Sequence, residues 1–262
     1  MFSRLRFLLL LPVATLLACG GASSPPTGTS YTPVAGDYVI TVGVGTAGQA
    51  NFNGDLVVNN TSVCPVSSVC GVFLYNGASA CTGGQPISFT GSFSSNVLTL
   101  TSASFSGSVA TLSITLPLSN NNLGQQLAGG NSVITGGTCS LASSTLQAQL
   151  IPSYTGTWSA TVSGPSAATA TLQVIQSTTA NADGEFPATG VLTFNPTGCT
   201  SAAPDNTYTG VVSGASLQLK SSQYNVSVTA NNAVTPATVT IGGDINGGGS
   251  SCMTAFTGTM TD

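Results

Sequence analysis

Histidine is missing from this sequence, and charged residues of both signs are scarce. The 262 residues include 3 Lys+Arg, 7 Asp+Glu and no His. The absence of His excludes a Ser-His-Asp triad, an imidazole general base and a His-containing metal site. Nucleic acid is excluded as a partner, because phosphate binding depends on Lys and Arg side chains that neutralise the backbone charge.

The few basic residues are unevenly placed along the chain. Arg4 and Arg6 lie at the N-terminus, so Lys220 is the only basic residue of the remaining chain, whose side-chain charge is then 1 − 7 = −6. Lys220 has no serine at the S-x-x-K spacing that a Ser-Lys nucleophile pair would use. We expect Lys220 to be a solvated residue near a strand end.

The acidic residues also give no catalytic arrangement. Hydrolysis of glycosides needs two placed carboxyl groups. Most of the acids stand beside Gly or Pro in segments that read as turns, where acidic residues serve turn geometry. No nucleophile and base can be paired, so the chain is predicted to be no enzyme and to need no cofactor. The seven acids are Asp37, Asp55, Asp183, Glu185, Asp205, Asp244 and Asp262.

The N-terminal segment has the organisation of an export signal. Arg4 and Arg6 precede the apolar run Phe7 to Leu17, which is too short for a stable transmembrane helix. Ala18 and then Cys19 follow this run. An ordinary signal peptide with a fortuitous cysteine is the alternative interpretation.

The four residues Leu16-Leu17-Ala18-Cys19 resemble the lipobox of bacterial lipoproteins. The resemblance covers only the signal segment, residues 1–18, and the modified Cys19. It implies diacylglycerol on the Cys19 thiol and cleavage before this residue. The membrane is then a partner through the lipid, and residues 19–34, rich in Gly, Ser, Thr and Pro, form a flexible tether. Gly20, in place of an aspartate, favours the outer membrane. We therefore expect an exported protein anchored to the cell envelope.

Period-two alternation of apolar and polar residues dominates the rest of the chain. Tyr38, Ile40 and Val42 share one face of a predicted strand, and similar short runs recur between Gly, Asn and Ser clusters. The segments 122–130 and 143–150 fit a short helical turn at most. The predicted fold is all-β, with two tandem antiparallel β-meander domains, each a small barrel or sandwich.

An internal repeat supports the division into two domains. Three blocks, GDYVITV, GVFLYNGASACT and FTGSFSSNVLTLTS, align with GTWSATV, GVLTFNPTGCT and YTGVVSGASLQLKS, in the same order. The offsets are 158 − 38 = 120, 199 − 81 = 118 and 217 − 98 = 119. Shared composition is the competing explanation. The repeat predicts a first β domain over residues 35–152 and a second over 153–262.

Six cysteines besides Cys19 are expected to pair in an oxidising exported compartment. Because Cys81 aligns with Cys199, the repeat gives each domain one long bridge, and the remaining two cysteines close a small loop. The predicted pairs are Cys81 with Cys139, Cys199 with Cys252, and Cys64 with Cys70.

One cluster of oxygen-bearing side chains could bind a metal ion. Asn181, Asp183 and Glu185 stand at alternate positions, as ligands do at the start of calcium loops. A hairpin turn built on Asp183-Gly184 explains the same residues, and we favour the turn.

Two functions remain open. The first is a lipid-anchored envelope protein with a non-catalytic structural or adhesive role, acting through an uncharged β surface. The alternative is a binding module whose calycin-like domains hold an apolar or carbohydrate ligand. A membrane-spanning barrel fits less well, because the predicted strands are short and aromatic residues make up only 6%.

Overall fold

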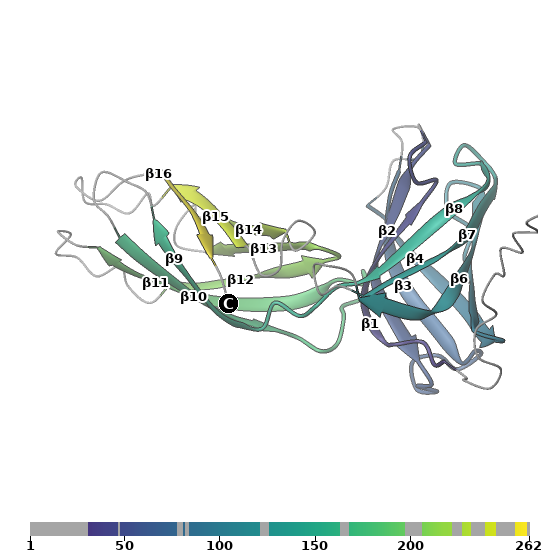
Figure 1. The fold of residues 1–262 in the computed structure, drawn as a ribbon, viewed down its shortest axis with the longest axis horizontal. Helices are drawn as coiled ribbons and strands as arrows, with labels where there is room; N and C mark the ends of the chain where they lie inside the picture. Colours follow the sequence, from purple (N-terminus) through teal and green to yellow (C-terminus); the bar gives the residue numbers. More distant parts are fainter. Residues whose placement is uncertain are drawn as a thin grey trace, which may run out of the picture. The chain divides into compact units, whose positions relative to one another are not determined.

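The chain folds into strands and turns, arranged as two antiparallel β-sheets (Figure 1). In this computed structural model, the described residues are 31–46, 48–77, 81, 84–120, 126–162, 168–196, 206–221, 227–231, 239–244 and 255–260. The predicted signal peptide, with Cys19 and most of the tether, lies outside them. No helix of the described residues is long and apolar enough to cross a bilayer. The predicted all-β fold with two β-meander domains is confirmed.

The first sheet is a closed barrel in which each strand pairs with the next in sequence. Pairing of β1 with β8 closes it, with Tyr38 opposite Leu150 and Val42 opposite Leu146. Closure removes the unpaired strand edges that an open sheet would expose. The strands are β1 (Gly36–Val42), β2 (Ala50–Val58), β3 (Val69–Asn76), β4 (Pro86–Ser94), β5 (Val97–Ser102), β6 (Ser108–Asn120), β7 (Gln126–Gly136) and β8 (Leu141–Leu150).

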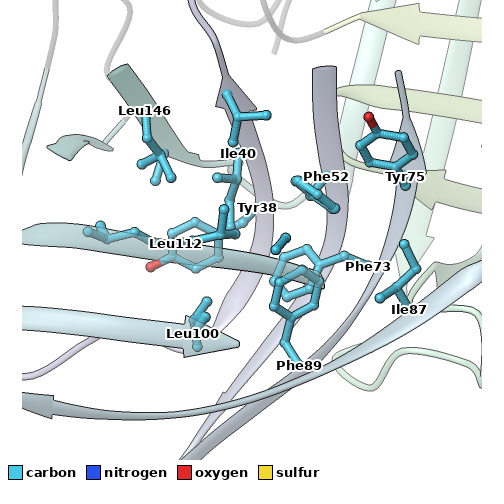
Figure 2. Close-up of a cluster of buried hydrophobic side chains, with 14 of the residues drawn as sticks. Tyr38, Ile40, Phe52, Phe73, Tyr75, Ile87, Phe89, Leu100, Leu112 and Leu146 are labelled. Carbon is cyan, nitrogen blue, oxygen red and sulfur yellow. The ribbon is translucent and has the colours of Figure 1, made fainter. Parts of the chain in front are cut away.

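The interior of this barrel is filled by apolar side chains. Alternate residues of each strand point inward, as the period of a strand requires. Figure 2 shows the rings of Phe52, Phe73 and Phe89 gathered in this core, with Tyr38 and Leu112 nearby. The centroid of the Phe89 ring is 5.3 Å from those of both Phe52 and Phe73, in edge-to-face geometry. Such aromatic pairs add to the stabilisation from burial alone.

The second sheet continues the meander and contains eight strands in sequence order. Its buried side chains include Trp158 and Tyr208, and Tyr154, just before β9, is buried as well. The first and last strands of this order also contact each other. The strands are β9 (Gly156–Val162), β10 (Ala168–Gln176), β11 (Phe186–Pro196), β12 (Asn206–Ser213), β13 (Ser216–Ser221), β14 (Ser227–Asn231), β15 (Val239–Asp244) and β16 (Ala255–Met260).

The hairpins of the two sheets share their register. Phe89 faces Ser102 between β4 and β5, and Tyr208 faces Ser221 between β12 and β13, so that 208 − 89 = 221 − 102 = 119. Tyr38 and Trp158 also correspond, since each is buried and each donates to a backbone carbonyl four residues earlier, at 2.8 and 3.0 Å. The correspondence in sequence is therefore also one of strand pairing.

Two segments that were expected to be irregular or weakly helical are strands instead. Residues 126–130 belong to β7, and 143–150 belong to β8. In β7 two adjacent glycines, Gly129 and Gly130, interrupt the alternation. Pairing with both neighbours overrides these weak local preferences.

Two disulfides join cysteines of the barrel. Cys64 bonds Cys70 across the loop between β2 and β3, with Cα atoms 5.5 Å apart. Cys81 bonds Cys139, with Cα atoms 5.3 Å apart and a sequence separation of 58. Both pairs match the predicted connectivity. The remaining pair, Cys199 with Cys252, lies outside the described residues.

The two disulfides should contribute unequally to stability, because the loops they close differ in length. Loop entropy predicts that replacing Cys81 and Cys139 by Ala lowers the free energy of unfolding by about 4 kcal/mol, against about 2 kcal/mol for Cys64 and Cys70. Urea denaturation of the two double variants measures the difference. Equal losses would contradict this account.

Candidate functional site

Two aspartates face each other on the outer surface of the barrel. Asp37 of β1 lies directly opposite Asp55 of β2 in the strand register. The residues that follow each of them, Tyr38 and Leu56, are buried in the barrel core, so both carboxyl groups point outward. Asn53 lies two residues before Asp55 and therefore shares this outer face.

A turn of the second sheet covers this face. Gly214 follows β12 with φ 53° and lies so close to the barrel that a Cβ atom on it would be 2.7 Å from Val39 Cγ2 and 3.0 Å from Asn53 Cγ. A second turn makes a similar approach, because a Cβ atom on Gly184 would lie 2.1 Å from the carbonyl oxygen of Val72. Asp37 is consequently only 4% exposed.

The segment between the two sheets also closes the site. The Ile151 N–H donates to the carbonyl oxygen of Asp37 at 2.9 Å. The hydroxyl of Tyr154 donates to the carbonyl oxygen of Ala215, beside Gly214. Ile151 and Tyr154 are both buried. The residues where the sequence places a domain boundary thus bind both β1 and the covering turn.

Several buried acceptor oxygens of this site lack a complete hydrogen bond. Neither carboxyl oxygen of Asp37 has a hydrogen-bond partner among the described residues, and the same holds for Oδ1 of Asn51 and of Asn53. Burial of an acceptor without a donor costs free energy. An acid in this position therefore favours the neutral form or needs a compensating positive charge.

Burial raises the pKa of both acids. Burial raises the pKa of Asp37 from its ordinary value of 3.8 to about 9, and the neighbouring Asp55 charge adds to the rise. The Gly214 backbone N–H opposes this change in pKa without completing a hydrogen bond to either oxygen. Burial also raises the pKa of Asp55, to about 6. Asp37 is therefore protonated at neutral pH.

The other charged residues of the region do not compensate this pair. Asp183 and Glu185 flank Gly184 and would add negative charge. Lys220 is exposed on β13, four residues beyond Ser216 and so about 13 Å along the strand from the Gly214 turn. Its exposure agrees with the expected solvated strand residue, and it lies opposite Thr209 in the strand register.

The Asn181 cluster forms a hydrogen-bonded turn. Asn181 Oδ1 accepts from the backbone N–H groups of Asp183 and Glu185 at 2.9 and 3.0 Å. The Gly184 N–H donates to the Asn181 carbonyl oxygen at 3.1 Å. Because its side chain caps the backbone, Asn181 serves the turn that we favoured over a calcium loop.

The sequence did not single out Asp37 and Asp55 as a pair. Asp37 is the second residue of β1, and Asp55 lies inside β2, whereas acids beside glycine were expected to serve turns. Alternation was the available signal, since Asn51, Asn53 and Asp55 alternate with inward-facing residues. The cover that buries Asp37 comes from residues far away in sequence, which alternation does not reveal.

The close approach of Gly214 to the barrel predicts that a methyl group at this position destabilises the fold. Gly214→Ala should lower the free energy of unfolding by about 1 to 3 kcal/mol beyond the backbone strain, because Cβ would overlap Val39 and Asn53. Gly45→Ala is the matched control, since Gly45 also has positive φ, 75°, with nothing within 4 Å. Urea denaturation should show the larger loss at Gly214; similar losses would refute the contact.

The acid pair predicts lower stability at higher pH in metal-free buffer. Asp37 and Asp55 keep protons in the folded chain that the unfolded chain releases at an ordinary pKa of 3.8, so unfolding becomes easier as pH rises from about 4 to about 9. Asp37→Asn removes the larger part of this dependence and should be more stable than the wild type at alkaline pH. Denaturation midpoints across this range test the slope, and parallel profiles would contradict the shift.

Comparison with known proteins adds no family to these observations. No protein-family model, no curated protein and no solved structure matches this chain. In the parts of the chain that the structure describes, no group of three His, Cys, Asp or Glu side chains is arranged to hold a metal ion. The function is inferred from the chain's own residues.

Proposed function

We propose that this protein is a non-catalytic component of the cell envelope, anchored by lipid on Cys19 and acting in a structural or adhesive role. The filled interior of the β1–β8 barrel is the observation that supports a structural or adhesive role. Phe52, Phe73 and Leu112 are fully buried there and occupy the space that a ligand would need. Function then resides in the outer surface and in attachment.

The outer surface suits contact without charge recognition. Outward positions on β4 and β5 carry hydroxyl side chains, among them Ser88, Thr90 and Thr101, which are exposed. The hydroxyl groups of such a surface are hydrated by water, while the core and the disulfides supply stability. This division fits a protein that must persist outside the cytoplasm.

The disulfides support an exported location. Cys64–Cys70 and Cys81–Cys139 are bonded in the barrel, and disulfides persist in oxidising compartments. The anchor itself is proposed from the apolar run Phe7 to Leu17 followed by Cys19. The outer membrane is the proposed destination, because Gly20 follows the modified cysteine.

A binding role is the second candidate, and a surface groove favours it. The groove has a volume of about 360 Å³ and combines apolar and polar side chains, as a site for a sugar or a small apolar molecule would. It is open to solvent, and Ala128 and Leu146 of the barrel core also line it. Its lining includes Val44, Ser119, Leu127, Thr145 and Gln147.

The anchor is tested by replacing the thiol. Cys19→Ser should release the protein from membranes, or leave an uncleaved precursor, because the lipid has no attachment site. Ser23→Ala, a change of similar size in the tether, should remain bound. Fractionation in salt, with mass measurement of the N-terminal peptide, distinguishes the forms. A Cys19→Ser protein that still partitions as a cleaved species with washed membranes would overturn the proposal.

A further inference from the structure

We propose that Asp37, Asp55 and Asn53 bind one calcium ion on the outer face of β1 and β2, beneath the Gly214 turn. The site differs from the Asn181 cluster that the sequence suggested. It is independent of the lipid anchor, since all three residues lie on β1 and β2.

The donor set is the first argument. Asp37 contributes two buried carboxyl oxygens that have no complete hydrogen bond among the described residues, in a side chain only 4% exposed. Asn53 contributes a buried Oδ1, also without a partner among the described residues. Oxygen acceptors without donors are the ligands of a hard cation, and calcium accepts both carboxylate and amide oxygens.

The geometry of the strands is the second argument. Residues directly opposite in antiparallel strands have Cβ atoms about 4.5 to 5.5 Å apart. Calcium–oxygen distances of about 2.3 to 2.6 Å allow one ion to bridge two such carboxylates. Asp37 and Asp55 form this kind of pair, and Asn53 lies on the same face. Calcium is favoured over magnesium because it tolerates irregular coordination, which water would complete.

Charge is the third argument. Two carboxylates placed opposite each other repel, and burial strengthens the repulsion. A divalent ion neutralises both. The chain offers no substitute, because its only basic residue beyond the N-terminal arginines is Lys220, which is exposed on β13.

The second sheet shows that the fold does not require acids here. Thr157 faces Gln173 between β9 and β10, in the same relation as Asp37 to Asp55. The offsets, 157 − 37 = 120 and 173 − 55 = 118, are those of the repeat. A neutral pair therefore satisfies the same strand pairing, and the two aspartates need an explanation of their own.

Calcium titration of the purified full chain, after dialysis against a chelator, tests the site. Isothermal calorimetry should saturate at one ion per chain, and Tm should rise with calcium concentration because the ion binds the folded state. Magnesium at equal ionic strength should raise Tm much less. Absence of binding, or an equal effect of the two ions, would overturn the proposal.

Matched variants locate the ion. Asp37→Asn and Asp55→Asn should each weaken calcium binding by more than about tenfold, since loss of even an outer-shell group costs that much. Asp183→Asn removes the same charge from an exposed turn and should bind as the wild type does. If Asp183→Asn weakens binding while Asp37→Asn does not, the ion lies in the Asn181 turn and the proposal fails. Asn53→Ala, which keeps both acids, should also bind more weakly, and undiminished binding would remove Asn53 from the site.

Discussion

Closure of the first barrel is the constraint from which the candidate site follows. Pairing of β1 with β8 sets Tyr38 opposite Leu150, so the chain leaves the barrel beside the strand on which it entered. Ile151 is then within reach of the Asp37 carbonyl oxygen, and its N–H donates to it. Tyr154, three residues later, reaches the turn that covers Asp37. The burial of this acid is thus a consequence of topology as well as of composition.

Scarcity of charge makes that burial consequential. In a chain with many Lys and Arg residues, a buried carboxylate pair would find a cationic partner. Here, within the described part of the chain, the donor near the pair is the Gly214 backbone N–H, which does not complete a hydrogen bond. Asp37 and Asp55 must be neutralised by protons or by a metal ion. If protons neutralise the pair, the fold loses stability as pH rises and these protons dissociate, whereas a bound ion keeps the pair neutral at high pH, so the two responses oppose each other in experiment.

Sequence patterns predicted the elements better than their packing. Alternation at Tyr38, Ile40 and Val42 is a local property, and all three side chains lie in the core as expected. The strands β7 and β8 were missed because glycines and polar residues weaken alternation, and long-range pairing decides their structure. The Asp37 site was missed for a related reason. Its cover is contributed by Gly214, 214 − 37 = 177 residues later, and no pattern within one strand reports such a contact.

The repeat separates what the fold needs from what the site needs. Ser95 occupies the place in the first sheet that Gly214 has in the second, and both follow a strand of matched hairpins. Ser95 adopts φ 50°, close to the 53° of Gly214, so the turn itself accepts a side chain. Glycine is therefore needed at position 214 because the close approach to Val39 and Asn53 leaves no room for a Cβ atom. Two departures from the repeat, a glycine in the covering turn and an acid pair beneath it, meet at one place, as expected if that place has a role beyond holding the strands together.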